Sequence, residues 1–343
     1  MVLALLKRLL EGSRLSRGEA RSAMDGLMEG SATPGQIGAF LAALKVRGET
    51  EEELAGFAEA MRARAIRVSI DRRPLLDTCG TGGDGAGTFN ISTAAAFVAA
   101  GAGAAVAKHG NRSVSSRCGS ADVLEALGVK PDPDPALANR CVSEAGLCFL
   151  FAPAFHPATR HVAPVRRELG VRTVFNLLGP LANPAGATRQ LMGVYDGRLL
   201  AAIATALRAL GTEEAMVVAA ADGLDELSPS APTRVAHLKD GRIREYEVTP
   251  ESAGVARQPE GACKGGDAAE NARILREVLE GRPGPAREAV RLNAAAALVV
   301  TGLAEDLRTG AVLAGRSIDS GKALKSLETL KLLTNGHLAK GAG

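Results

Sequence analysis

Along residues 1–67, apolar positions recur at the three-to-four-residue spacing of helices that bury one face. Short polar breaks divide this region into four such segments. Ser16, Thr33 and Thr50 precede three of them, where a side-chain oxygen can accept a hydrogen bond from the first turn. Pro34 stands at a first helical position, which tolerates proline. The pattern predicts a small all-helical unit.

After Pro74 the pattern changes to short apolar runs that alternate with helical segments. The runs are 74–79, 104–110, 147–153, 190–195 and 214–221, and the helical segments are 91–101, 120–128, 134–146 and 197–211. Residues 233–248 alternate around Asp240-Gly241, which is typical of a hairpin. Strands that alternate with helices predict an α/β domain with a mostly parallel sheet. We therefore expect a helical domain over 1–69 and an α/β domain over 74–343.

Composition excludes several classes of function. The 343 residues are 46% hydrophobic and 23% charged, and the net charge of +3 does not favour nucleic acid or membrane binding. Aromatic residues make up only 3%, so a platform for stacking bases would have few rings. The longest apolar stretch, 94–107, is too short for a membrane span. The five cysteines include no CxxC pair, which indicates reduced thiols in a cytoplasmic protein.

Three polar segments directly follow predicted strands. They are GTGGDG from Gly80, KHGNRSVSS from Lys108 and DGLDE from Asp222. Ligands of open α/β sheets bind beyond the carboxyl ends of the strands. We therefore expect the three loops to meet at one site.

The glycine loop from Gly80 lies between a strand and a helix. Glycines allow backbone N–H groups to face a phosphate, and the start of a helix favours an anion. The loop lacks the lysine of a Walker A motif, so it is no P-loop. Taken alone, it is equally consistent with a tight turn.

The second and third loops contain charged residues that favour a phosphate ligand and a metal ion. Lys108, Arg112 and Arg117 accompany four serines, a set that can hold a phosphate, although a solvated basic loop has the same composition. Two phosphate-binding loops suggest a ligand with two separated phosphate groups. The carboxylates of Asp225 and Glu226 suit Mg²⁺ beside such a ligand, with an acidic surface turn as the alternative.

With these motifs the sequence resembles the anthranilate phosphoribosyltransferase family of tryptophan biosynthesis. The resemblance is carried by GTGGDG and NIST within 80–93, KHGNRSVSS and GSAD within 108–122, PVRRELGVRTVFNLLGPLANP over 164–184 and GLDE over 223–226. It covers essentially the whole chain. It implies transfer of the phosphoribosyl group of 5-phosphoribosyl 1-pyrophosphate to the amine of anthranilate, with pyrophosphate released.

The resemblance also implies roles for individual residues. Phosphoribosyl pyrophosphate would be bound by Gly80, Gly83, Asp84, Thr88, Asn90, Ile91, Ser92, Thr93, Lys108, Asn111, Arg112, Ser113, Ser115, Ser116 and Ser120. Anthranilate would be bound by Gly80, Asn111 and Arg166, and two Mg²⁺ ions by Ser92, Asp225 and Glu226. No residue is expected to act as nucleophile or base, and His109 is given no catalytic role.

For the architecture, the resemblance implies the fold shared by nucleoside phosphorylases and phosphoribosyltransferases of this type. A segment near 164–181 would join the N-terminal helices, and the helical domain would form a homodimer.

Two other functions share some of these features. A pyrimidine nucleoside phosphorylase would also use a glycine-rich loop, but GLDE and NLLGPLANP argue against it. A non-catalytic relative that binds nucleic acid would need a basic face and would have lost the acidic pair.

Overall fold

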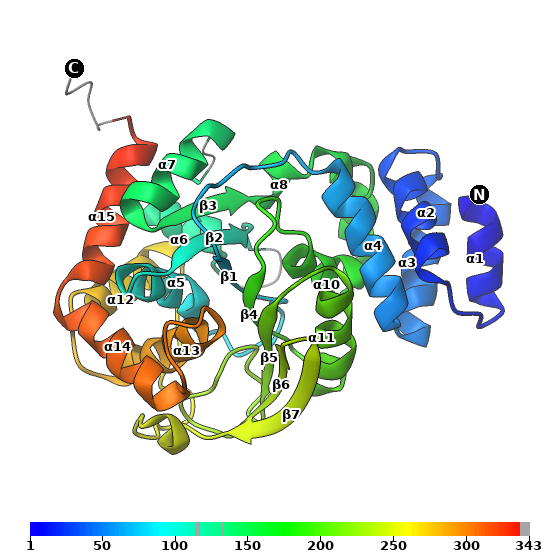
Figure 1. Cartoon of the computed structure of the whole chain (residues 1–343). Helices are drawn as coiled ribbons and strands as arrows, with labels where there is room; N and C mark the ends of the chain where they lie inside the picture. The colour runs from blue at the N-terminus through cyan, green and yellow to red at the C-terminus, as the bar shows by residue number, and fades with distance from the viewer. Residues whose placement is uncertain (114–116, 132–133, 337–343) are drawn as a thin grey trace.

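The computed structural model describes residues 1–113, 117–131 and 134–336. Its N-terminal part is a bundle of helices at one end of the molecule (Figure 1). The helices are α1 (Val2–Leu10), α2 (Arg17–Met28), α3 (Pro34–Arg47) and α4 (Glu51–Arg64). Ser16, Thr33 and Thr50 each form a capping box at the start of a helix, and Pro34 occupies the first turn of α3, as the sequence predicted.

A later part of the chain returns to this bundle. Helix α9 (Ala163–Leu169) contacts α3, and α10 (Val174–Leu181) contacts α3 and α4. Val165 and Phe175 are buried in the same apolar cluster as Phe40 and Phe57. The stretch from α9 to α10 therefore lies between the bundle and the sheet.

The rest of the chain is built on one central sheet. In the part of the chain that the structure describes, the sheet has seven strands in the order β3-β2-β1-β4-β5-β6-β7. They are β1 (Leu75–Gly80), β2 (Ala105–Gly110), β3 (Leu147–Phe151), β4 (Arg189–Gly193), β5 (Glu214–Ala220), β6 (Thr233–Lys239) and β7 (Arg242–Val248). Neighbours from β3 to β5 are parallel, whereas β6 and β7 run antiparallel. The predicted fold class, a helical domain plus a mostly parallel α/β domain, is confirmed.

The hairpin at the sheet edge follows its turn residues. Asp240 and Gly241 both have positive φ, 49° and 72°, as the turn between β6 and β7 requires. The order of the parallel strands reverses at β1, because β2 lies on one side of it and β4 on the other. Such a reversal opens a crevice at the carboxyl ends of the two strands.

Helices cover both faces of the sheet (Figure 1). On one face, α5 (Ile91–Gly101) contacts α13 (Pro285–Val300) and α15 (Lys322–Thr334). On the other face, α11 (Leu200–Ala209) contacts α4, β5 and β6. The further helices are α6 (Ser120–Ala126), α7 (Pro135–Ala145), α8 (Ala152–Phe155), α12 (Ala268–Leu279) and α14 (Leu307–Asp319). Val217 and Val218 of β5 belong to different apolar clusters, since successive side chains point to opposite faces.

Among the described residues, no helix combines the length and the apolar character needed to cross a bilayer.

The closest helix contact in the bundle yields a prediction. A methyl group at Gly56 of α4 would lie 2.2 Å from the carbonyl oxygen of Arg17 in α2. Gly56→Ala must force the two helices apart, so we expect it to lower the free energy of unfolding by about 1–3 kcal/mol. Urea denaturation measures the change.

Gly35→Ala is the matched control, because nothing lies within 4 Å of the added methyl group in α3. It should leave stability unchanged or raise it slightly. Equal stability of the two variants would contradict the packing argument.

Candidate active site

The loops that follow β1, β2 and β5 lie at the carboxyl edge of the sheet. The glycine loop begins where the N–H of Thr81 donates to the carbonyl of Gly193 at 3.0 Å. Gly82 and Gly83 have φ of 65° and 77°, a region that other residues avoid. Asp84 steadies the turn, because its carboxylate accepts from the N–H of Ala86 at 3.2 Å.

The acidic loop after β5 reaches the glycine loop directly. Asp225 Oδ2 accepts a hydrogen bond from the N–H of Gly82 at 2.7 Å. Glu226 Oε1 accepts from the N–H of Ser92 at 3.0 Å. These two contacts join the end of β5 to the end of β1 and to the start of α5.

Two features hold the acidic loop in this place. The buried amide of Asn293 in α13 donates to the carbonyl of Leu227 at 2.9 Å and accepts from its N–H at 3.0 Å. Asp222 turns back into its own loop, where it accepts from Ser228 Oγ at 2.6 Å. Asp222 therefore supports the loop and does not join the other carboxylates.

The carboxylates at this edge oppose one another. Burial and the nearby Asp84 carboxylate raise the pKa of Asp225 to about 7. Burial and Asp225 raise the pKa of Glu226 well above its usual range. A divalent cation would relieve this repulsion, so the residues fit such an ion.

The carboxylates alone do not complete a metal site. Over the described ranges, no group of three or more His, Cys, Asp or Glu side chains is placed to hold a metal ion. The remaining ligands would have to be hydroxyl, water or phosphate oxygens. This is the ligand set that Mg²⁺ takes when it binds with a phosphate substrate.

Lys108 is buried beneath the site, with an exposed fraction of 2%. Its Nζ donates to the carbonyl of Thr78 and to Ser92 Oγ, the latter at 3.4 Å. Burial lowers the pKa of Lys108, and the carboxylates of Asp77 and Glu226 oppose that shift. The lysine thus supplies positive charge from within the sheet.

The loop after β2 differs from the sequence-based expectation of clustered cations. Arg112 forms ion pairs with Asp122 and Glu125 at 3.1 and 2.5 Å, so two carboxylates already neutralise it. Arg117 is exposed on the surface. Of the three expected cations, only Lys108 lies beneath the glycine loop, because strand β2 turns its side chain inward.

The other predicted residues of that loop form its internal hydrogen bonds. Asp122 Oδ2 accepts from the N–H of Ser113 and of Gly119 at 3.0 and 2.8 Å. Ser120 Oγ donates to the carbonyl of Asn111 at 3.2 Å. Ser115 and Ser116 lie outside the described residues.

Helix α5 begins beside the acidic loop. Its N-cap Asn90 makes no capping bond, because its side chain instead donates to the carbonyl of Cys118 at 3.3 Å and accepts from Asn271 at 3.0 Å. Thr93 Oγ1 is buried and has no hydrogen-bond partner among the described residues. The cap role passes to Glu226, whose carboxylate accepts from the N–H of Ser92 in the first turn, so the helix start already holds one negative group of the chain. Ile91 is buried in the core behind it.

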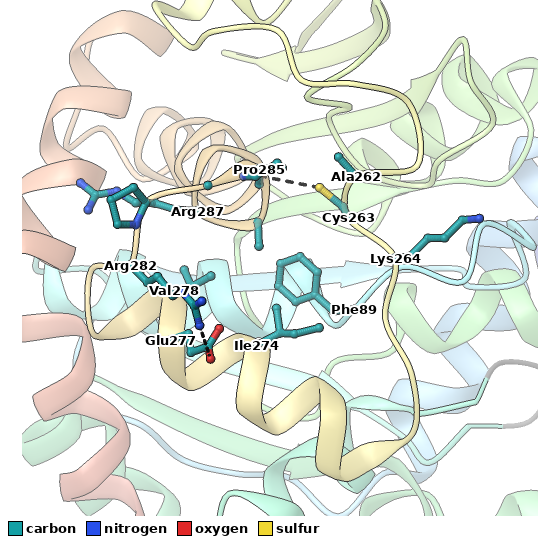
Figure 2. Close-up of a pocket in the computed structure, with 13 residues that line it drawn as sticks. Phe89, Ala262, Cys263, Lys264, Ile274, Glu277, Val278, Arg282, Pro285 and Arg287 are labelled. Atoms are coloured by element: carbon teal, nitrogen blue, oxygen red, sulfur yellow. Dashed lines mark hydrogen bonds and ion pairs between the residues drawn. The ribbon is translucent and has the colours of Figure 1, made fainter.

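A strip of chain that sequence reasoning missed supports the glycine loop from behind. The N–H of Phe89 donates to the carbonyl of Cys263 at 3.1 Å, and Thr88 forms a β-bridge with Lys264. A cavity of about 190 Å³ lies beside Phe89, between α12 and the start of α13. Figure 2 shows the side chains that line it. No sequence motif marks this strip.

The stretch from α9 to α10 brings further groups to the edge. Arg166 is half-buried, and its Cζ lies 5.1 Å from the centre of the Phe175 ring. Its guanidinium forms no ion pair or hydrogen bond within the described ranges, and burial lowers its pKa. Its neighbour Arg167 is exposed. An unpaired, partly buried guanidinium is suited to a carboxylate ligand.

His109 is the second-last residue of β2, and its side chain contacts α10. Its Nδ1 is 3.0 Å from the carbonyl of Gly179, and its ring centre is 5.1 Å from that of His156. Burial lowers the pKa of His109 to about 3 and that of His156 to about 4. Both rings are therefore neutral at physiological pH.

Comparisons with known proteins agree with one another. Residues 72–324 match the model of the glycosyl transferase family, a/b domain, and residues 3–65 match its helical bundle domain. The anthranilate phosphoribosyltransferase of Anaeromyxobacter sp. (strain K) is 55% identical over 334 residues, which cover 97% of this chain and 99% of the relative.

Solved structures are similar over nearly the whole chain. The crystal structure of anthranilate phosphoribosyltransferase from Thermus thermophilus has a TM-score of 0.91 and 47% identity, covering 96% of this chain and 99% of that one. The Saccharomyces cerevisiae enzyme in complex with PRPP and Mg has a TM-score of 0.89 and 31% identity, covering 98% of each chain.

Proposed function

Since the chain belongs to the anthranilate phosphoribosyltransferase family and transfers the phosphoribosyl group of 5-phosphoribosyl 1-pyrophosphate to anthranilate, we propose how its residues divide this work. The products are N-(5-phosphoribosyl)anthranilate and pyrophosphate, the second step from chorismate to tryptophan. One observation carries the assignment. The acidic pair of the β5 loop meets the glycine loop and the start of α5, so carboxylates that suit a cation lie beside two elements that suit phosphates.

We propose that the glycine loop, the start of α5 and the loop after β2 hold phosphoribosyl pyrophosphate. The residues are Gly80, Gly83, Asp84, Thr88, Asn90, Ile91, Ser92, Thr93, Lys108, Asn111, Arg112, Ser113, Ser115, Ser116 and Ser120. The positive φ values of Gly82 and Gly83 and the position of the glycine loop before the start of α5 support this assignment. Arg112 would have to leave Asp122 and Glu125 before its guanidinium could reach a phosphate.

Magnesium fits the acidic pair. We propose two Mg²⁺ ions, held by Ser92, Asp225 and Glu226 together with substrate oxygens. When bound, Mg²⁺ neutralises charge on the departing pyrophosphate. The raised pKa values of both carboxylates support a site whose charge is balanced only by cations.

The reaction breaks the bond between C1 of the ribose and pyrophosphate, which leaves with the bonding electron pair, and the anthranilate nitrogen forms the new bond to C1 and then loses a proton to water. Positive charge develops on the ribose, and the acidic edge of the site favours it. An aryl amine is neutral at pH 7, so it needs no strong base before it attacks. We assign no nucleophile or base to the protein, and catalysis then rests on holding two substrates in line.

For anthranilate we propose Gly80, Asn111 and Arg166. Arg166 lies at the junction with the helical part and has no acidic partner among the described residues. Gly80 ends β1, and Asn111 begins the loop after β2.

We further propose that the chain divides into a helical domain of residues 1–69, joined by 164–181, and an α/β domain of residues 74–343. We propose a cytoplasmic homodimer, formed through the helical domain. Leu3 and Leu10 support this, because they are exposed and seven residues apart on α1, so both face outward on one stripe. The five cysteines are free and buried, which suits a reducing compartment.

The activity and the metal site can be tested together by following the loss of anthranilate fluorescence. The wild-type protein should consume anthranilate only when phosphoribosyl pyrophosphate and Mg²⁺ are both present. The double variant Asp225→Asn with Glu226→Gln should lose turnover. Its unfolding temperature should not fall, because neutral amides remove the repulsion between buried carboxylates.

Glu305→Gln, an exposed acid far along the chain, is the control and should keep full activity. Normal turnover of the double variant at low Mg²⁺ would contradict the metal assignment. Phosphorolysis of thymidine or uridine in place of anthranilate consumption would overturn the function.

Arg166→Ala should weaken the binding of anthranilate and leave the binding of the other substrate unchanged. A lost hydrogen bond to a charged group costs about 1.5–3 kcal/mol, or roughly a 10- to 150-fold rise in the Michaelis constant for anthranilate. The constant for phosphoribosyl pyrophosphate should change little. Arg167→Ala is the control, since its side chain is exposed on the same helix. If both Michaelis constants rise equally, or if only Arg167→Ala raises the constant for anthranilate, a group other than Arg166 binds the carboxylate.

Sedimentation velocity tests the dimer. The chain has a mass of 35.2 kDa, so we expect a species of about twice that mass at micromolar concentration. Leu3→Glu with Leu10→Glu should shift it toward the monomer, because a charge on the apolar stripe would have to be desolvated. A wild-type monomer would contradict the proposal.

A further inference from the structure

Arg172 lies directly over the glycine loop. It belongs to the short connection between α9 and α10. A methyl group added at Gly83 would lie 3.4 Å from its Cδ and Nε and 3.5 Å from its Cζ. Gly83 has φ of 77° and no side chain, so the guanidinium can approach the backbone of the loop closely.

Tyr195 holds Arg172 in this position. The Cζ of Arg172 is 4.3 Å from the centre of the Tyr195 ring, which is the distance of a stacked guanidinium. Tyr195 follows β4, and its own N–H donates to Thr81 Oγ1 in the glycine loop at 3.2 Å. The platform and the loop are therefore fixed to each other.

The donors of Arg172 are unused. Within residues 1–113, 117–131 and 134–336, its guanidinium makes no hydrogen bond and no ion pair. By contrast, Arg112 in the loop after β2 is paired with two carboxylates. An exposed guanidinium that lies over a ring and has no acidic partner can present its planar fork to a ligand.

The position of Arg172 beside the glycine loop indicates which part of the substrate its guanidinium can bind. The same turn of the glycine loop that lies under Arg172 also meets the acidic pair, because the N–H of Gly82 bonds to Asp225. A pyrophosphate bound with cations at Asp225 and Glu226 would therefore lie within reach of Arg172. We propose that Arg172 binds the pyrophosphate of the phosphoribosyl donor, and that Tyr195 is the positioning residue for its guanidinium. This inference rests on the proposed function.

The proposal gives the two arginines of the junction different tasks. Arg166 has its guanidinium against Phe175, partly buried, whereas Arg172 is exposed above the glycine loop. One would hold the acceptor and the other the leaving group. Loss of Arg172 should therefore weaken the binding of the phosphoribosyl donor and of the product pyrophosphate, and leave the binding of anthranilate unchanged.

Isothermal calorimetry in the presence of Mg²⁺ measures the binding of each ligand without turnover. Arg172→Ala should bind phosphoribosyl pyrophosphate and inorganic pyrophosphate at least about tenfold more weakly than wild type. This factor is the lower end of the range for a lost hydrogen bond to a charged group, because Arg172 is exposed. Tyr195→Leu should lower the affinity for both ligands by about two- to fivefold, because the guanidinium loses its contact with the ring. Tyr195→Phe keeps the ring and should restore wild-type affinity. Arg167→Ala, on the neighbouring helix, should bind as wild type does.

Several results would overturn the assignment. If wild type binds phosphoribosyl pyrophosphate and Arg172→Ala binds it equally well, Arg172 does not contact it. A loss confined to phosphoribosyl pyrophosphate, with inorganic pyrophosphate unaffected, would place Arg172 at the ribose phosphate. An equal loss in Arg167→Ala would show a general effect of charge. If wild type itself binds no phosphoribosyl pyrophosphate, the proposed function fails as well, and the two failures are thereby distinguished.

Discussion

The site depends on how closely the acidic loop approaches the ends of β1 and β4. These strands are paired so that Gly80 lies opposite Gly193, and both are the last residues of their strands. A methyl group at Gly193 would lie 1.4 Å from the carbonyl oxygen of Asp225, and one at Gly80 would lie 2.5 Å from its Oδ2. Any side chain at either position would lift the loop. The acidic pair reaches the glycine loop because two neighbouring strands end without side chains.

The close approach of the acidic loop to the glycine loop has an electrostatic cost, which bound cations would offset. With Asp225 and Glu226 held near Asp84, each ionised carboxylate makes the next harder to ionise, and the pKa of Asp225 rises to about 7. Lys108 offsets part of this charge from below, but it is itself buried. Cations that bind only the ordered loop stabilise that arrangement by mass action. In the proposed site, the metal and the donor would bind together, because the cations would need phosphate oxygens as ligands and the phosphates would need the charge of the cations.

Local sequence patterns predicted most of the fold. Ser16, Thr33 and Thr50 marked helix starts because capping is a short-range interaction, and Asp240-Gly241 marked the hairpin for the same reason. The meeting of the loops followed from parallel topology alone. What the sequence could not supply were long-range pairings. Nothing in KHGNRSVSS shows that Arg112 is neutralised by Asp122 and Glu125. Likewise, the strip at Cys263 that supports Phe89 lies far along the chain and carries no motif.

Arg166 and Arg172 both belong to the stretch that packs on α3 and α4, whereas the glycine loop and the acidic pair belong to the sheet. In the proposed arrangement, this stretch supplies one guanidinium for the carboxylate of the acceptor and a second one for the leaving group. Two substrates held in this way would be aligned for attack of the amine on C1. Because an aryl amine needs little activation, the rate depends on this alignment more than on proton transfer. A chain without a nucleophile–base pair can therefore catalyse the transfer by geometry, provided that each substrate is held from its own side of the crevice.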